Sequence, residues 1–238
     1  MRRHVRVLAP LAAVASLAMG TTATQGWAAE TEDQTALDRA KFFIEFNATD
    51  NDMGVQADFG GPSWEAMEIV SPDGRKVFHV DRGSLKELGL SELLYESEEP
   101  SLDDLPREQF MALFPEGEYE FIGKTIEGDE LESTATLTHN IPDAPVIISP
   151  ADGPADPSNT VVEWKPVTGP AGIEIAGYQV TVEREDPPRV FSVDVPGTST
   201  SVTVPAYFLE SGTKYTLEVL AIEAGGNRTI TVSSFETE

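Results

Sequence analysis

The sequence has no cysteine and few basic residues, and each scarcity excludes a class of chemistry. Without cysteine there are no disulfide bonds, thiol nucleophiles or thiolate metal sites. Lysine and arginine together number 16, against 41 aspartate and glutamate residues, which gives a formal net charge of -25. A chain this acidic repels both the phosphate backbone of nucleic acids and anionic lipid surfaces, so we expect neither as a partner.

Histidine is also scarce, and the sequence lacks the motifs that mark common enzymes. His79 and His139 stand alone, without the repeated histidine pattern of a transition-metal site, so we expect structural or solvent-facing roles for both. There is no Gly-x-Ser-x-Gly elbow, phosphate-binding loop or dinucleotide fingerprint. Paired carboxylates hydrolyse glycosides only at a set separation, which a sequence does not supply. We therefore predict no enzyme activity, no catalytic residues and no cofactor-binding residues.

Residues 1–28 are organised like a secretory signal peptide. Arg2 and Arg3 precede an apolar run at residues 7–20, and small residues then lead to Ala28. A basic start, a short apolar middle and a small-residue exit are the features of a cleaved leader, so we predict cleavage after Ala28 and export. The alternative is an uncleaved N-terminal anchor. After cleavage we expect no stable membrane insertion, and the leader leaves periplasmic and extracellular locations open.

The first half of the mature chain has the pattern of a β-domain. Residues 29–40 are polar and acidic, and we expect a flexible N-terminus there. From Phe42 onward, apolar residues recur at every second position, which is the period of a half-buried strand. Turns that contain Gly74 and Gly128 predict two hairpins. The sequence thus predicts an N-terminal β-sandwich-like domain over residues 41–142.

Residues 84–114, between the two hairpins, have a different pattern. Four leucines in this segment are spaced more like a helix than a strand. Farther along, Asp104 and Pro106 predict the start of a short helix, and Pro115 predicts its end. We therefore interpret the segment as a long crossing loop with one or two short helices. The leucines concerned are Leu85, Leu88, Leu93 and Leu94.

Residues 143–238 resemble a fibronectin type III domain. Short strand patterns separated by Pro and Gly breakers are typical of a two-sheet sandwich. Trp164 stands where the family has the buried tryptophan of its second strand, and Tyr215 matches the family's tyrosine corner, whose hydroxyl bonds to upstream backbone. Leu209, Gly212 and Thr213 complete the approach to that corner. Two prolines in residues 140–145 restrict the link, so we expect two domains held at a limited angle.

The first half resembles the N-terminal part of exported bacterial proteins that end in one such domain. The residues that carry this resemblance are 47–50 with Gly54, 114–119 and 136–139. The resemblance implies no activity. Together the two halves predict a mainly β chain of two tandem immunoglobulin-like β-sandwiches, the first with one or two short helices inserted and the second of fibronectin type III type.

One compact polar motif suggests a metal. Asp50 and Asp52 lie beside Gly54, with Asp58 downstream, and closely spaced carboxylates can gather oxygen ligands around calcium. The spacing does not match a complete calcium-binding loop. The other interpretation is an Asp/Asn-rich turn whose side chains cap their own backbone. Both interpretations stay open at this point.

Surface features suggest binding to a protein or glycan. Trp64 and Tyr95 adjoin loops and could stack against sugars, although a core role is the alternative. Leu220 and Ile222 lie on the strand face opposite Tyr215, so they either cover an interdomain or partner surface or are scattered surface residues. We predict an exported, non-enzymatic binding or spacer protein. The alternatives are an accessory module of a polymer-degrading system and a calcium-stabilised adhesin-like protein.

Overall fold

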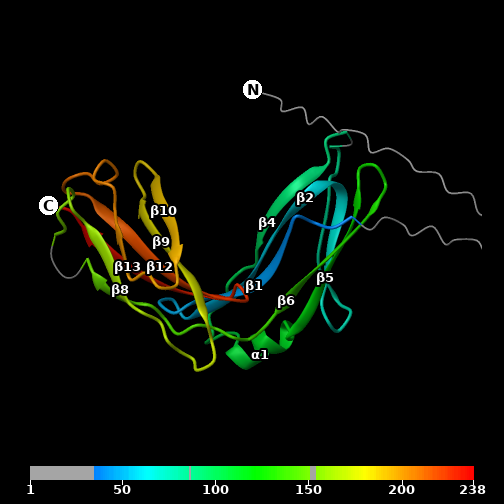
Figure 1. The fold of residues 1–238 in the computed structure, drawn as a ribbon, viewed down its shortest axis with the longest axis horizontal. Helices are drawn as coiled ribbons and strands as arrows, with labels where there is room; N and C mark the ends of the chain where they lie inside the picture. The colour runs from blue at the N-terminus through cyan, green and yellow to red at the C-terminus, as the bar shows by residue number, and fades with distance from the viewer. Residues whose placement is uncertain (1–34, 86, 151–153) are drawn as a thin grey trace, which may run out of the picture. The chain divides into compact units, whose positions relative to one another are not determined.

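A computed structural model describes residues 35–85, 87–150 and 154–238. The predicted signal peptide and most of the predicted flexible N-terminus therefore lie outside the described residues. The described chain is mainly β with one short helix, as the sequence predicts (Figure 1). The elements of the first half are β1 (Arg39–Asn47), β2 (Asp52–Val70), β3 (Lys76–Asp81), β4 (Leu90–Glu96), α1 (Arg107–Leu113), β5 (Gly117–Thr125) and β6 (Glu130–Leu137).

Strand β2 changes its partners partway along its length. Its first part, up to Gly60, pairs with β1 on one edge and with β4 on the other. Trp64 pairs with Leu90 of β4 and with Thr125 of β5, and from Ala66 onward β2 pairs with β3 and β5. The register with β4 shifts between Gly60 and Trp64. A strand that bends from one layer into another lets two sheet layers face each other across a core. Gly61 lets the backbone before β1 pack closely against β2, because a Cβ there would lie only 3.0 Å from the backbone nitrogen of Asp38.

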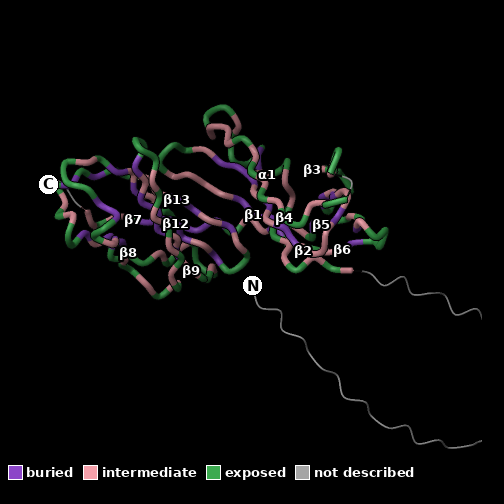
Figure 2. The backbone as a smooth tube through the Cα atoms, turned by 90° about the horizontal axis from the view of Figure 1, so that it is seen from above, coloured by how far each residue is buried: buried purple, intermediate pink, exposed green. Residues whose placement is uncertain are grey.

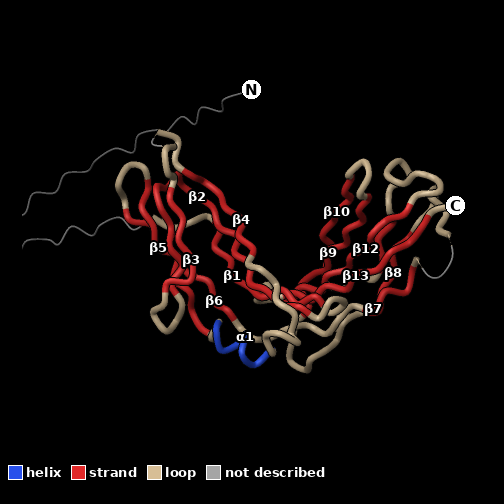
Figure 3. Tube along the Cα trace, turned by 180° about the vertical axis from the view of Figure 1, so that it is seen from behind, coloured by secondary structure: helices blue, strands red, loops and turns tan. Residues whose placement is uncertain are grey.

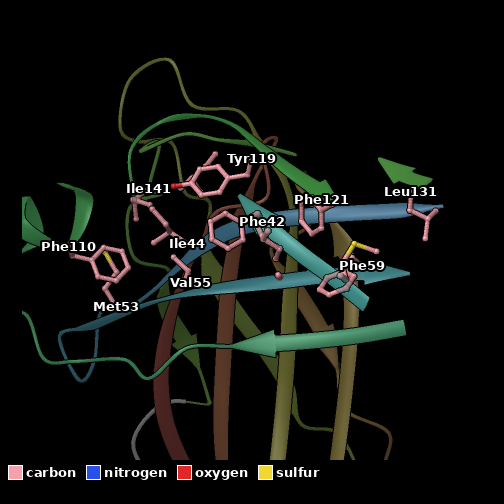
Figure 4. Close-up of a cluster of buried hydrophobic side chains, with 14 of the residues drawn as sticks. Phe42, Ile44, Met53, Val55, Phe59, Phe110, Tyr119, Phe121, Leu131 and Ile141 are labelled. Atoms are coloured by element: carbon pink, nitrogen blue, oxygen red, sulfur yellow. The ribbon is translucent and has the colours of Figure 1, made fainter. Parts of the chain in front are cut away.

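Buried aromatic residues fill the space between these layers. Phe42 and Ile44 of β1 point into it, as the period-two pattern predicts, together with Phe59 and Trp64 of β2. Phe121 of β5 lies 5.4 Å from Phe59 between ring centroids, in an edge-to-face arrangement (Figure 4). Aromatic pairs of this geometry stabilise a core beyond the burial of their area.

Residues 90–96 form strand β4, so the interpretation of residues 84–114 as a crossing loop with one or two short helices was wrong for that part. Strand β4 pairs with β2, and Leu93 and Tyr95 face the core while Leu94 is 71% exposed. Leucine spacing in a short segment fits either a helix or a strand, and pairing with β2 decided the outcome. The predicted short helix is confirmed as α1, which follows Pro106 and buries Phe110.

The second half is a sandwich of two sheets. Its strands are β7 (Val146–Ser149), β8 (Val161–Lys165), β9 (Ile175–Arg184), β10 (Arg189–Pro196), β11 (Ser201–Thr203), β12 (Lys214–Glu223) and β13 (Arg228–Glu236). One sheet has the order β11-β8-β7, and β10-β9-β12-β13 belong to the larger sheet. Trp164, Tyr178 and Tyr215 are fully buried between them. Figure 2 shows buried stretches along the strands and exposed residues at many turns.

The larger sheet continues from one half of the chain into the other. Strand β1 pairs in parallel with β13, with Glu45 opposite Arg228 and Asn47 opposite Ile230. Figure 3 shows the strands in red and α1 in blue. This pairing, which we call the seam, makes one sheet with the order β10-β9-β12-β13-β1-β2-β5-β6. The seam was not predicted, because strands whose paired residues are 183 positions apart carry no local pattern that shows which edges pair. The predicted boundary between residues 142 and 143 lies between β6 and β7 and stays a prediction.

Candidate functional site

A groove of about 370 Å³ opens on the face of the sheet at the seam. Its lining residues come from strands on both sides of the seam and occupy alternate positions on them, because successive side chains of a strand point to opposite faces. The core-facing residues of the same strands belong to the two hydrophobic cores. This seam groove is lined by Glu45 of β1, Asp58 of β2, Glu96 of β4, Glu218 and Leu220 of β12 and Arg228 of β13, among others.

The floor of the seam groove is apolar. Phe43, Leu220 and Ile230 are each buried, although they lie on the face opposite the cores. The guanidinium of Arg228 lies over the Phe43 ring, 4.1 Å from its centroid, in a cation–π contact. Leu220 therefore belongs to the surface that joins the two halves, which is one of the two roles predicted for it. Ile222 is half-buried and does not line the groove.

The walls of the seam groove carry more negative than positive charge. Burial raises the pKa of Glu45, with the negative charge of Glu96 adding to the rise and Arg228 opposing it. Burial also raises the pKa of Glu218. Asp58, the remaining carboxylate of the lining, accepts a 2.7 Å hydrogen bond from Arg39 Nε, and this ion pair balances its negative charge. The groove thus holds carboxylates whose charge is incompletely balanced.

Glu99 forms an acidic trio with two of these residues. Carboxylate oxygens of Glu45, Glu96 and Glu99 all lie within 4.8 Å of one another. Burial raises the pKa of Glu99 to about 7, and the charges of Glu45, Asp52 and Glu96 add to the rise. Among the described residues, Oε1 of Glu99 and Oδ1 of Asp52 are buried without a hydrogen-bond partner. Oxygen ligands of this kind suit a hard cation such as calcium, or else a shared proton.

Sequence reasoning missed this trio. Its members come from β1, from β4 and from the segment after β4, and only the flanking of β2 by both strands brings them together. Local spacing in a sequence cannot show that Glu45 and Glu96, 51 residues apart in the chain, lie close together. Of the residues singled out in the sequence, Asp52 came closest to marking this cluster, because its charge contributes to the raised pKa of Glu99.

The structure places Asp58 apart from Asp50 and Asp52, the other two predicted calcium residues. Asp50 lies in the β1–β2 turn and accepts a 2.9 Å hydrogen bond from Asn47 Nδ2. Asn47 Oδ1 in turn accepts hydrogen bonds from the backbone nitrogens of Thr49 and Asp50, which is the capping that the turn interpretation requires. Asp58 lies farther along β2 and bonds to Arg39. Calcium binding by Asp50, Asp52 and Asp58 stays a prediction.

Asn227 ties the seam to the segment that links the two halves. Its side chain is buried, and its Oδ1 accepts a 2.8 Å hydrogen bond from the backbone nitrogen of Ile44. Its Nδ2 donates to the backbone oxygens of Thr138 and Asn140 and to the Thr138 hydroxyl. Thr229 adds a hydrogen bond from its hydroxyl to the backbone oxygen of Pro142. These bonds fix the position of β1 and of the link relative to β13.

The predicted aromatic stacking residues belong to the first core. Trp64 is fully buried, and Tyr95 packs against Phe78 with ring centroids 4.6 Å apart. His139 contacts the backbone oxygen of Phe114 at 2.8 Å through Nε2, while His79 lies on the surface 3.3 Å from Glu68. The core interpretation therefore holds for both aromatics.

The second half has the internal features that its resemblance implies. Trp164 is buried against Tyr178, with ring centroids 5.2 Å apart. The Tyr215 hydroxyl accepts a 2.8 Å hydrogen bond from the backbone nitrogen of Glu210, five residues upstream, which is the tyrosine corner. These features define an immunoglobulin-like β-sandwich. Residues 151–236 match the family model of the fibronectin type III domain, so the chain contains a fibronectin type III domain in its second half.

Solved structures similar to this chain include proteins with such domains. The fibronectin type III domain of human collagen alpha-1(XX) is 30% identical, with 40% of this chain and 82% of that chain covered and a TM-score of 0.30. A two-domain segment of chicken tenascin is 12% identical, with 84% and 100% covered and a TM-score of 0.31. The tetra-tandem repeat of a large adhesion protein is 12% identical, with 84% and 50% covered and a TM-score of 0.31. No curated protein matches the chain significantly.

The described residues contain no helix of the length and apolar character needed to cross a membrane.

Proposed function

We propose that the chain is an exported, non-enzymatic binding or spacer protein that acts through the surfaces of its β-sandwiches outside the cytoplasm. The observation that carries the proposal is the fibronectin type III domain joined to the first half by a hydrogen-bonded strand pair. A spacer must hold its two ends at a defined separation, and the buried bonds of Asn227 supply that restraint. Export rests on the leader pattern of residues 1–28.

The binding part of the proposal rests on the seam groove. It combines an apolar floor with polar walls, and such a combination is common at sites that recognise other molecules. Charged and apolar groups on one sheet face can contact a partner without any reaction step. The function therefore needs no catalytic residue.

Export is tested by expressing the full chain in a bacterial host and fractionating the cells. We expect the chain outside the cytosol with a mass that corresponds to cleavage after Ala28. A variant without residues 1–28 should stay in the cytosol and serves as the control. A full-length, uncleaved chain in the cytosol would contradict export, and turnover of a polysaccharide that stops in Glu96→Gln would contradict a non-enzymatic role.

A calcium-stabilised protein is the second candidate, favoured by the acidic trio and by the nearby Asp52. Calcium that binds only the folded chain would raise its melting temperature. The sequence-based site predicts that Asp50→Ala/Asp52→Ala removes this rise, whereas the trio predicts that Glu99→Gln removes it. An unchanged melting temperature at millimolar calcium would contradict both.

A further inference from the structure

The seam groove crosses several strands, which sets the size of what it can hold. Its lining residues belong to strands in the consecutive order β9-β12-β13-β1-β2-β4. Neighbouring strands lie about 4.8 Å apart, so this stretch of sheet is roughly 24 Å wide. An extended chain advances about 3.3 Å per residue, and a segment of about seven residues would span it.

The charges within the seam groove are not balanced. Asp58 forms an ion pair with Arg39. Arg228 lies over the Phe43 ring, and among the acidic residues Glu45 has the largest effect on the pKa of Arg228. Among the described residues, Glu96 and Glu218 have no lysine or arginine within ion-pair distance. Two carboxylates on opposite sides of the seam are thus left facing the groove without a cation.

Apolar side chains lie next to these carboxylates. Leu94 is two residues from Glu96 on the same face of β4 and is 71% exposed. Leu220 is likewise two residues from Glu218 on β12 and lies in the buried floor. Each unpaired carboxylate therefore has an apolar neighbour at strand spacing, on either side of the seam.

We propose that the seam groove binds a basic, extended segment of a partner protein, with lysine or arginine side chains on Glu96 and Glu218 and apolar side chains on Leu94 and Leu220. This inference rests on the proposed binding function and names the chemistry of the partner. Successive side chains of an extended segment alternate between faces, and the long stems of lysine and arginine cover apolar surface while their charged ends reach a carboxylate.

Several charged groups surround the proposed contact. Glu45 lies between the two carboxylates, because β1 stands between β12, which carries Glu218, and β4, which carries Glu96, in the order of the sheet. Burial of Glu218 without a cation is unfavourable, and a cation offsets that cost, whereas Glu96 is exposed and open to an ion pair. Lys41 and Arg228 are the basic residues of the lining, and Arg228 lies opposite Glu45 across the seam and over the Phe43 ring. The net charge of -25 also favours the approach of a basic partner over an acidic one.

The test measures binding of a seven-residue peptide with blocked termini to the purified chain at about 0.15 M NaCl. The peptide has lysine at positions 1 and 7, leucine at positions 3 and 5 and threonine between them, so that its lysines and leucines share one face of an extended chain. The same peptide with glutamate in place of both lysines has the same length and apolar content and serves as the peptide control. We expect the lysine peptide to bind and the glutamate peptide not to bind. On isotopically labelled protein, the lysine peptide should shift the amide signals of Leu94 and Leu220.

Matched variants locate the contact. Glu96→Gln/Glu218→Gln should raise the Kd of the lysine peptide about tenfold, the effect of losing two exposed ion pairs. Glu120→Gln/Glu163→Gln removes the same charge from two exposed strand residues outside the groove and should change the Kd less than twofold, because charges beyond about 8 Å are screened. Melting curves of both double variants establish that each is folded.

Three results would overturn the proposal: no binding of the lysine peptide, equal weakening in both double variants, or amide shifts elsewhere on the chain. If the chain is exported, and if the unsubstituted chain and Glu96→Gln/Glu218→Gln capture a partner equally well, the proposed function holds and only this inference is overturned. A chain that is not exported would overturn the proposed function while leaving the peptide result to decide the groove.

Discussion

Replacing the buried Asn227 by alanine should destabilise the whole chain, because its side chain bonds to both halves at the seam. The side chain is 1% exposed and makes four hydrogen bonds, one as an acceptor and three as a donor. Alanine would leave the backbone nitrogen of Ile44 without its 2.8 Å partner. The backbone oxygens of Thr138 and Asn140 would lose a donor as well.

The magnitude follows from the groups left without partners. A buried donor without a partner costs about 1–3 kcal/mol, and each neutral hydrogen bond contributes about 1 kcal/mol. We count about 2 kcal/mol for the unpaired backbone nitrogen of Ile44 and about 1 kcal/mol for the lost bonds to the carbonyl oxygens. The expected total loss in the free energy of unfolding is therefore about 3 kcal/mol. For a chain of this size that corresponds to a decrease of about 6–12 °C in melting temperature.

Urea unfolding, followed by tryptophan fluorescence and by circular dichroism, measures the loss. Asn159→Ala removes an exposed asparagine outside the seam and should change the free energy by less than about 0.5 kcal/mol. Asn227→Asp keeps an acceptor for Ile44 but places a carboxylate against carbonyl oxygens, so its stability should recover as the pH falls. A loss of less than about 1 kcal/mol in Asn227→Ala would refute the reasoning that the seam depends on these bonds.

The remaining predictions concern the tyrosine corner, pH and salt. Tyr215→Phe leaves the backbone nitrogen of Glu210 without its 2.8 Å acceptor and should cost about 2 kcal/mol in urea unfolding, whereas Tyr207→Phe, on a side chain that is 80% exposed, should cost almost nothing. Glu99 has its pKa raised from 4.5 to about 7, so the folded chain binds a proton there that the unfolded chain has lost. Stability should therefore fall as the pH rises through that window, and melting curves of Glu99→Gln should show a smaller fall; equal falls in both proteins would contradict the assignment. Because the net charge is -25, the melting temperature should rise between about 0.05 and about 1 M NaCl, and an unchanged value would show that self-repulsion is unimportant.

Short-range patterns predicted the parts of the fold that depend on neighbouring residues. The period-two spacing of Phe42 and Ile44 places both in the first core, as predicted. Trp164 and Tyr215 are buried in the second core, as predicted. A short helix forms beside Pro106, although it begins at Arg107, one residue after the proline that was predicted to lie in its first turn. These outcomes follow from which side chains must leave water and from which residues can start a helix, and both are local properties.

The first part of residues 84–114 shows where such patterns are insufficient. Leu93 and Leu94 fit a helical spacing, yet they lie on opposite faces of β4 because that strand completes the edge of β2. The same limit applies to Asp50, Asp52 and Asp58. They are close in sequence, but Asp58 pairs with Arg39 instead of joining the other two.

The sequence by itself determined a mainly β chain, the burial of its alternating apolar residues and a fibronectin type III domain in its second half, because these depend on side-chain character and local spacing. Only the tertiary structure decided that β1 pairs with β13, that Glu45, Glu96 and Glu99 meet, and that a groove crosses the seam. Backbone hydrogen bonds are the same for every residue type, so a strand edge does not specify its distant partner. That choice is made by the packing of the whole chain.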